Sequence, residues 1–271
     1  MTAVLFVNRY KAAAISLSQT IERVLKTQYD IEIALHPEQA DIAFSIGGDG
    51  TVLRTAQLVA PFNIPLLTIH LGTLGFIAAV TSEQWQAVFE QWLEKKSHIS
   101  RRSMLEVTVE RQGSHIFHRS CLNDAVITSS GIAKMINLTV NTVHARLGTY
   151  RSDGLIVATP TGSTAYSVSA GGPIVDPELE AIIVNPICPF ALANRPIVMA
   201  TIDPILIEVS AHQRTEIVLT LDGQVTETLK PRDHVQVSKA PYCALLIAAD
   251  RTSFYRALYT KLAGQESSHA S

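Results

Sequence analysis

The sequence lacks the features that mark membrane, secreted and disulfide-rich proteins. No uninterrupted apolar run approaches the roughly 18 residues of a transmembrane helix. The N-terminus has no basic start followed by a long apolar core, so it does not resemble a signal peptide. The three cysteines, Cys121, Cys188 and Cys243, are widely spaced and odd in number, which argues against a disulfide framework or a zinc site. These absences predict a soluble, cytoplasmic protein that has reduced thiols and no membrane partner.

The sequence also lacks an excess of charge of either sign. The net charge is −2 over 271 residues, which argues against a general nucleic-acid binder because such a protein normally has a basic face. No Gly-Lys pair occurs, so a Walker phosphate loop is excluded. We find no internal repeat and no low-complexity linker. The length and the 47% hydrophobic content suit one large or two modest domains.

Over the first hundred residues, short apolar runs alternate with segments of helical periodicity. Trp85, Val88, Phe89 and Trp92 recur at three- and four-residue intervals, which predicts a buried helix face. The alternation predicts an α/β domain over residues 1–100 with a Rossmann-like parallel sheet, which binds ligands at the carboxyl ends of its strands. The predicted strands span 3–7, 31–35, 42–46 and 64–70, and the predicted helices span 13–26, 51–58 and 82–94.

Near Arg101 the pattern changes to short strands with alternating side chains, which predicts a mainly β domain over 101–248. An amphipathic helix within 249–263 should pack back on the first domain, since Phe254, Leu258 and Leu262 would otherwise be exposed. We expect the small, polar tail at 264–271 to be disordered. The predicted strands are 104–110, 116–120, 125–128, 135–143, 155–158, 205–210, 216–221 and 235–238, with a helical turn at 163–170.

The stretch from Ile42 to Thr51 runs from an apolar strand into a glycine turn, Gly47-Gly48-Asp49-Gly50. Glycines let a backbone approach a bulky ligand, and the amides at the start of the next helix favour phosphate. A carboxylate there would repel phosphate unless it binds a metal or takes a proton. The turn therefore indicates a phosphate site that also performs chemistry. The alternative is a tight turn in which Asp49 is the N-cap of the helix.

Two later stretches are also suited to a nucleotide. In Leu122-Asn123-Asp124, the amide can pair with a base edge and the carboxylate can accept from ribose hydroxyls, although an Asx turn explains the same residues. Residues 159–173 combine hydroxyls and glycines with one ring, Tyr166, and a buried strand runs into them. We interpret this segment as a ligand surface rather than a simple loop.

The other polar motifs are less informative. Asp222-Gly223 is typical of a hairpin turn, from which Gln224 can reach a ligand. The nine histidines are scattered without metal-ligand spacing, so we predict no protein-built metal site.

Together these stretches resemble the NAD kinase family. The resemblance covers roughly residues 42–225 and rests on a series of motifs in order. Asp124 departs from it, since many members have glutamate there. The glycine turn alone also occurs in lipid kinases and, in similar form, in phosphofructokinases, but the 159–167 run is not expected in them. The motifs are Gly47–Thr51, Leu74–Phe76, Leu122–Asp124, Asp153–Leu155, Thr159–Ser167, Gly171–Pro173, Pro186–Pro189 and Asn194–Ile197.

The resemblance implies a phosphotransferase. The γ-phosphoryl group of ATP, or in some members polyphosphate, passes to the 2′-hydroxyl of the adenosine ribose of NAD, which gives NADP and ADP. It also implies an N-terminal α/β domain, a C-terminal β-sandwich domain that binds NAD, and a homodimer or homotetramer. Mg²⁺ or another divalent cation would accompany the triphosphate.

Residue roles follow from the resemblance as hypotheses. Asp49 would be the general base, and the amides around Gly47, Gly48 and Gly50 would hold phosphate. Arg54 would meet phosphate or, alternatively, face solvent, while Asn123 would bind adenine and Asp124 the ribose. The remaining expected ligand contacts are Phe76, Lys134, Arg151, Asp153, Thr161, Thr164, Ala165, Tyr166, Ser167, Ser169 and Gln224.

Two alternatives to an NAD kinase remain at this point. A lipid or sugar kinase that shares only the glycine turn would transfer phosphate without NAD. A non-catalytic sensor would bind NAD or NADP without turnover. Asp49 argues against the sensor, because pure binding of polyphosphate gains nothing from a carboxylate in that position.

Overall fold

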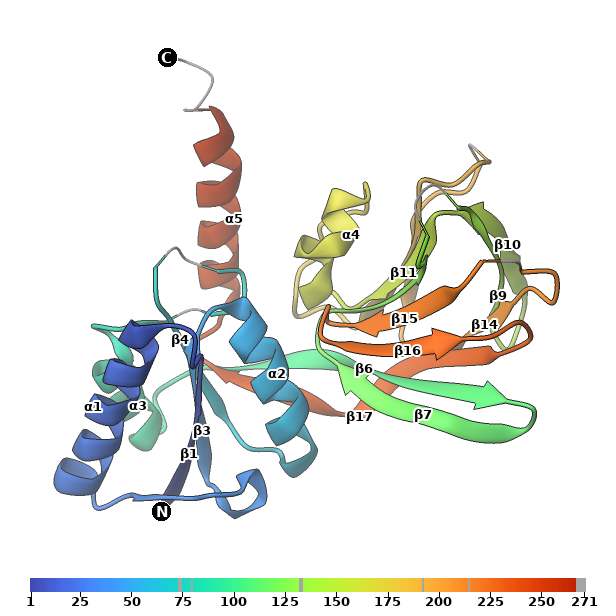
Figure 1. Ribbon diagram of the computed structural model, residues 1–271. Helices are drawn as coiled ribbons and strands as arrows, with labels where there is room; N and C mark the ends of the chain where they lie inside the picture. The colour runs from blue at the N-terminus through green and yellow to red at the C-terminus, as the bar shows by residue number, and fades with distance from the viewer. Residues whose placement is uncertain (73–74, 79, 132–133, 192, 214, 267–271) are drawn as a thin grey trace. The chain divides into compact units, whose positions relative to one another are not determined.

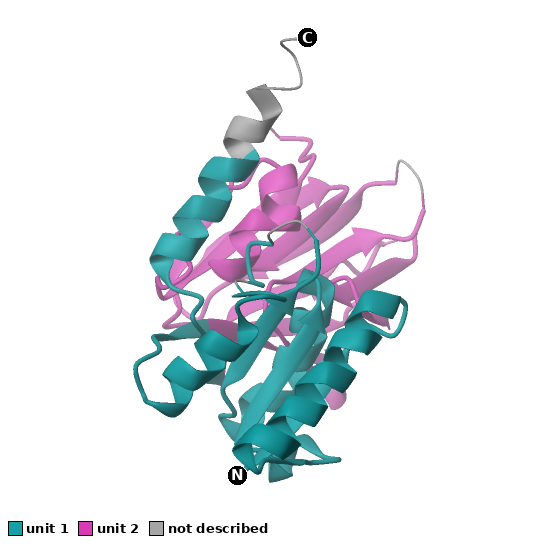
Figure 2. Cartoon of the chain, turned by 90° about the vertical axis from the view of Figure 1, so that its left-hand side faces the viewer, with its two compact units in different colours: residues 1–102, 242–271 teal, residues 103–241 magenta. Residues whose placement is uncertain are grey.

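The computed structural model describes residues 1–72, 75–78, 80–131, 134–191, 193–213 and 215–266, with no side chains described at 262–266. The chain divides into two compact units, which are coloured separately in Figure 2. Unit 1 comprises residues 1–102 and 242–271, and unit 2 comprises residues 103–241. The chain leaves unit 1 within β6 (Ile99–Arg111) and returns to it within β17 (His234–Ile247).

Unit 1 is a parallel sheet with helices on both faces (Figure 1). Its strand order is β2–β1–β3–β4 followed by the end of β17, and β5 also pairs with β4. The elements are β1 (Thr2–Val7), α1 (Ala12–Tyr29), β2 (Glu32–Ile33), η1 (Pro37–Gln39), β3 (Ile42–Gly47), α2 (Asp49–Val59), η2 (Ala60–Phe62), β4 (Leu66–His70), β5 (Val80–Thr81), α3 (Trp85–Leu93) and α5 (Arg251–Glu266).

Alternation along β3 and β4 divides the side chains of unit 1 between two layers. Phe44 and Ile46 share one core with Ile21 of α1 and with Trp85 and Phe89 of α3. The next residues along β3, Ser45 and Gly47, point to the opposite face, and Figure 1 shows α2 on that side of the sheet. Every residue of β3 is buried, as expected for a central parallel strand. The glycine turn therefore starts from a strand that is fixed on both faces.

Unit 2 consists of two antiparallel sheets around a shared aliphatic core. One sheet has the order β10–β9–β14–β17, together with the β6–β7 hairpin, and the other has the order β13–β12–β11–β8–β15–β16. The elements are β7 (Ser114–Cys121), β8 (Asp124–Ser129), β9 (Ile136–Asn141), β10 (Arg146–Ser152), β11 (Gly154–Ala158), η3 (Thr161–Thr164), α4 (Tyr166–Ser169), β12 (Ala181–Ile187), β13 (Ile197–Ala200), β14 (Ile205–Val209), β15 (Ile217–Leu221) and β16 (Val225–Leu229).

The predicted fold class is confirmed, with differences in detail. The helix that follows the glycine turn, α2, begins at Asp49 rather than at Thr51. Its N-cap is Gly48, so the interpretation of Asp49 as the N-cap was wrong. The predictions omitted β5, β10, β12, β13 and β16. The fully buried β12 contains Pro186, which lowers its strand signal, and a bulge near Gly148 interrupts the register of β10.

The C-terminal segment differs mainly in length. Phe254 of α5 is buried as predicted, and the side chain of Leu262 lies outside the described part. The helix continues to Glu266, past the predicted end at 263, so residues 264–266 are helical. Residues 267–271 of the predicted disordered tail fall outside the described residues. No helix in the described part of the chain is long and apolar enough to cross a membrane.

One ion pair ties distant segments of unit 2 together. The Arg111 guanidinium at the end of β6 donates from Nε to Asp233 Oδ1 at 2.9 Å and from Nη2 to Asp233 Oδ2 at 2.8 Å. Nη2 also donates to the Thr228 carbonyl at 2.9 Å, and the Lys230 amide donates to Asp233 Oδ2 at 2.7 Å. The Asp233 side chain is 1% exposed, so its charge depends on these donors.

We expect Arg111→Met to destabilise the protein by about 3 kcal/mol, because it leaves a buried carboxylate without its cation. The measurement is urea unfolding followed by fluorescence. Lys26→Met, which breaks the exposed Lys26–Glu22 pair, is the control and should change little. Equal midpoints for wild type and Arg111→Met would show that the pair does not stabilise unit 2.

Candidate functional site

The carboxylate of Asp49 lies at the carboxyl end of β3, in the first turn of α2. Its Oδ2 accepts the Phe76 backbone N–H at 3.2 Å, and its Oδ1 accepts the Ala78 N–H at 3.2 Å. Both amides belong to the segment that follows β4, so two strand ends meet at this side chain, as expected at this edge of a parallel sheet. The two amides fix the orientation of the carboxylate.

Glycine is required at two positions around Asp49. A Cβ added at Gly75 would lie 2.1 Å from Asp49 Oδ1, so any side chain there would displace the carboxylate. A Cβ at Gly47 would lie 2.3 Å from the Thr51 hydroxyl. Gly48 is different, because its φ of −117° suits any residue and nothing lies within 4 Å of its missing Cβ. Folding therefore does not require glycine at position 48, whereas close approach of a ligand to the backbone would require it.

The other predicted residues of unit 1 surround this turn or lie on α2. Gly50 and Arg54 are exposed on α2, so Arg54 is directed to solvent in the absence of a ligand. Phe76 is half-buried. Leu74 of the predicted Leu74-Gly75-Phe76 motif lies outside the described residues.

His70, which was not among the predicted site residues, is the register partner of Gly47 across β3 and β4. Its ring is buried, and Nδ1 lies 3.1 Å from the Gly72 carbonyl, so Nδ1 carries the proton. Nε2 is buried and has no hydrogen-bond partner among the described residues. A single histidine between Ile69 and Leu71 carries no local pattern that would have identified it.

In unit 2, Asn123 and Asp124 lie at the start of β8, and both are buried. Three successive backbone amides, those of Leu122, Asn123 and Asp124, donate to the carboxylate of Asp222 at 2.7–3.2 Å. Asp222 adopts a positive φ of 51° in the turn between β15 and β16. The sequence identified Asp222 only as a turn residue, because its partners are about one hundred positions away.

Burial, and to a smaller extent the nearby Asp222 carboxylate, raise the pKa of Asp124 from its usual value to about 7. The Tyr166 backbone N–H hydrogen-bonds to Asp124 and opposes this shift. Asp124 therefore exchanges its proton near neutral pH, which is unusual for an aspartate. A carboxyl group shifted in this way, close to a ligand segment, is a candidate functional group.

The Thr159–Ser169 segment packs directly on Asn123. Thr159 donates its hydroxyl to the Leu122 carbonyl at 2.6 Å and its amide to the Asn123 carbonyl at 2.8 Å. A Cβ at Gly162 would lie 2.1 Å from the Asn123 carbonyl oxygen, so only glycine permits this approach. The contact brings the segment that contains Thr161 and Tyr166 against Asn123 and Asp124.

Two buried polar atoms at this contact have no partner among the described residues. They are Oδ1 of Asn123 and Oγ1 of Thr161. Because an unmade hydrogen bond of a buried group costs about 1–3 kcal/mol, such atoms indicate a missing ligand or water. A base amino group or a ribose hydroxyl could supply the donor that Asn123 Oδ1 lacks.

Further along the segment, exposure varies. Tyr166 and Ser169 are exposed, whereas Thr164 and Ala165 are half-buried. Ser167 is completely buried, and both its carbonyl (2.9 Å) and its hydroxyl (3.2 Å) accept from Asn185 Nδ2. Ser167 therefore holds the segment on β12 rather than presenting its hydroxyl to solvent.

The remaining predicted contacts differ in exposure. Lys134 and Gln224 are exposed, and Asp153 is half-buried between β10 and β11. Arg151 is exposed and lies over the Phe190 ring at 5.0 Å. Among the residues that the structure describes, no group of three or more His, Cys, Asp or Glu side chains could hold a metal ion.

Comparisons with known proteins cover both units. Residues 8–97 match the family model of the ATP-NAD kinase N-terminal domain, and residues 122–249 match that of the ATP-NAD kinase C-terminal domain. NAD kinase from Treponema denticola is 40% identical over 231 residues, which are 85% of this chain and 81% of that protein. NAD kinase from Syntrophotalea carbinolica is 42% identical over 226 residues, which are 83% and 79%.

Solved structures agree in fold. A yeast NADH kinase complexed with NADH has a TM-score of 0.89 at 23% identity, covering 97% of this chain and 87% of that one. An NAD kinase from Archaeoglobus fulgidus in complex with ATP has a TM-score of 0.73 at 26% identity, covering 96% and 97%. The match extends far beyond the glycine turn, so a lipid or sugar kinase that shares only this turn is not favoured. The chain belongs to the ATP-NAD kinase family.

Proposed function

We propose that this chain is an NAD kinase in which Asp49 is the general base. The 2′-hydroxyl oxygen of the adenosine ribose attacks the γ-phosphorus of ATP, and the bond from that phosphorus to the bridging oxygen of ADP breaks. The hydroxyl proton passes to the Asp49 carboxylate, and the products are NADP and ADP. This assignment extends the family membership to the reaction and to individual residues.

The observation that carries the proposal is the placement of Asp49. Its carboxylate lies in a glycine turn and is fixed by two backbone amides, one on each oxygen. A carboxylate has about four acceptor positions, so these two donors leave room for a substrate hydroxyl. The open backbone at Gly48 and the exposed start of α2 suit a phosphate group beside it.

Unit 2 supplies the groups that we assign to NAD. Asn123 would accept from the adenine amino group through Oδ1, and Asp124 would accept from ribose hydroxyls when ionised. Thr161 and Tyr166 lie on the segment packed against them and would contact the dinucleotide. The unpartnered Oδ1 of Asn123 and Oγ1 of Thr161 support this role, because they need a ligand or water to be satisfied.

We further propose Mg²⁺ or another divalent cation, a cytoplasmic location and a homodimer or homotetramer. The described residues offer no ready cluster of three ligands, which suits a cation that is held largely by the triphosphate and water, and Asp49 is the carboxylate in the glycine turn that could contact it. When bound, such a cation neutralises charge on the transferred phosphoryl group. Sedimentation analysis of the purified protein tests the oligomer, and activity across a series of cations tests the metal.

We expect Asp49→Asn to lower kcat for NADP formation from NAD and Mg-ATP by about 10²-fold or more, because asparagine keeps the shape but cannot take the proton. Asp30→Asn is the matched control, since Asp30 is exposed at the end of α1 and should leave kcat unchanged. Normal turnover by Asp49→Asn would remove this residue from proton transfer.

Asp124 predicts a pH dependence of stability. Its carboxyl group ionises at about 7 in the folded protein, but near its usual 3.8 when unfolded. Folding is therefore opposed increasingly as pH rises from about 4 to about 7, by an amount on the order of 4 kcal/mol at pH 8. We expect Asp124→Asn to raise Tm at pH 8 by several degrees and to change it much less at pH 5, as measured by calorimetry.

The same variant should bind NAD more weakly. Below pH 7 the wild-type carboxyl is protonated and loses an acceptor for ribose hydroxyls, so KM for NAD should rise as pH falls, and Asp124→Asn should abolish this dependence. Asp30→Asn should follow wild type in both experiments. A Tm difference between wild type and Asp124→Asn that is equal at pH 5 and pH 8 would contradict the raised pKa.

A further inference from the structure

The segment that holds Asp49 is itself held by two other elements of unit 1. The Thr68 hydroxyl of β4 donates to the Ile77 carbonyl at 3.3 Å. On the other side, the Phe76 ring lies 6.2 Å from the Phe254 ring of α5, and Lys261 Nζ lies 4.3 Å from the centroid of the Phe76 ring. The residue that donates to Asp49 Oδ2 is therefore in contact with the C-terminal helix at two positions.

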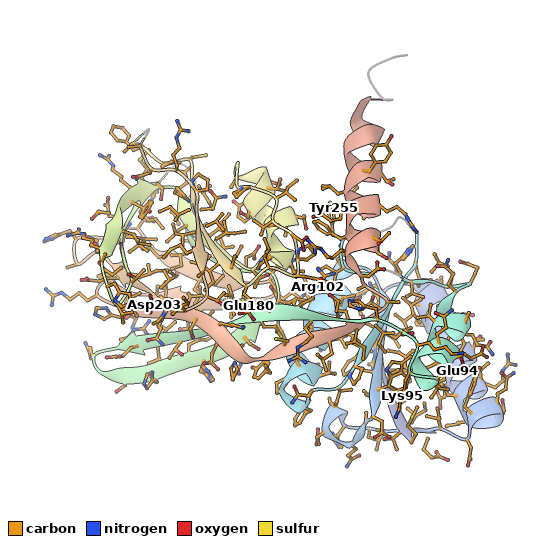
Figure 3. All side chains as sticks on the ribbon, turned by 180° about the vertical axis from the view of Figure 1, so that it is seen from behind. Glu94, Lys95, Arg102, Glu180, Asp203 and Tyr255 are labelled. Atoms are coloured by element: carbon orange, nitrogen blue, oxygen red, sulfur yellow. The ribbon has the colours of Figure 1, made fainter. Side chains whose placement is uncertain are left out.

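The start of α5 is firmly anchored. The Asp250 carboxylate accepts the Ser253 N–H at 2.8 Å, which caps the helix and keeps the pKa of Asp250 below its usual value. The buried Arg102 guanidinium donates to the Ala249 carbonyl at 2.7 Å, and Figure 3 shows Arg102 beside this end of the helix. The Ala248 amide also donates to the His98 carbonyl at 3.0 Å.

Little space remains between this anchored end and the Asp49 segment. A cavity of about 10 Å³, enough for about one water molecule, is lined by Gly75 and Phe76 on one side and by Arg102, Ser253 and Phe254 on the other. Phe254 and Phe76 therefore border the same small pocket, and their rings are in contact.

Beyond its first turns, α5 rests on a narrow face. Among its described side chains, residues 251–261, only Phe254 and Ala257 are buried, while Tyr255 and Tyr259 are 49% and 75% exposed. Most of the helix surface thus contributes little to the core of unit 1, whereas Phe254 and Lys261 contact Phe76.

We propose that α5 positions Asp49 through Phe76, with Phe254 and Lys261 as the positioning residues. Phe254 fixes the Phe76 ring and Lys261 covers it, so the Phe76 amide stays within hydrogen-bond distance of Asp49 Oδ2. The carboxylate then has one orientation toward the ribose hydroxyl. This inference rests on the proposed role of Asp49 as the base, and it adds a C-terminal element far from Asp49 in sequence to the residues that set the rate.

The test measures kcat, KM for NAD and Tm of Phe254→Leu and Lys261→Met. Phe254→Leu should lower kcat by about tenfold or more, because misplacement of a catalytic group by about 1 Å can cost up to about 10²-fold. Lys261→Met should lower kcat by about two- to fivefold, and it is the variant to interpret if Phe254→Leu unfolds. KM for NAD should stay within about twofold in both, and Phe254→Tyr, which keeps the ring, should restore kcat.

Tyr259→Ala is the matched control on the same helix and should behave as wild type in all three measurements. The decisive comparison places Phe254→Leu in the Asp49→Asn background, where it should cause no further loss of kcat. An equal additional loss there, or a lowered Tm with normal kcat in the single variants, would overturn the positioning role. Normal turnover by Asp49→Asn alone would instead refute the proposed base, whatever the α5 variants do.

Discussion

The pair of hydrogen bonds from the Phe76 and Ala78 amides to Asp49 is the constraint on which unit 1 depends. Two strand ends must meet for it to form, since Asp49 follows β3 and the amides follow β4. It explains why position 75 has no side chain, because a Cβ there would overlap the carboxylate. The same arrangement suits the role that we propose for Asp49, since a fixed carboxylate needs no reorganisation before it accepts a proton.

Unit 2 is organised around a carboxylate in a different way. Asp222 has three amide donors, whereas Asp124 is buried beside it and its pKa is raised to about 7. The Asp222 carboxylate, which accepts three backbone amides, thus makes the neighbouring Asp124 harder to ionise. Unfavourable interactions of this kind between neighbouring groups are common at functional sites, where activity is retained at a cost in stability. Asparagine at position 124 would relieve this interaction, but it offers one uncharged acceptor oxygen where a carboxylate offers two charged ones.

The sequence predicted the features that local pattern determines. The fully buried β3, the aromatic face of α3 and the change to β structure near Arg101 follow from periodicity, and the order of the motifs identified the family. Features that depend on distant partners were not predictable. Asp222 was interpreted as a turn residue and Ser167 as a ligand contact, because Asp222 binds Leu122–Asp124 and Ser167 binds Asn185 only in the folded chain. Strand β12 was missed because its buried residues include Pro186.

Asp49 in unit 1 and Asn123 in unit 2 differ in whether their side-chain hydrogen-bond partners are already in place, and this difference bears on how a ligand acts. The carboxylate of Asp49 has its amide donors in place. In unit 2, Asn123 Oδ1 and Thr161 Oγ1 are buried without a partner among the described residues, and Asp124 resists ionisation. A dinucleotide that donates to these acceptors would remove costs that the unliganded fold bears. If NAD binds as we propose, binding energy from its adenosine half would partly offset strain already present in unit 2, while Asp49, the proposed base, is held by its two amides without a ligand.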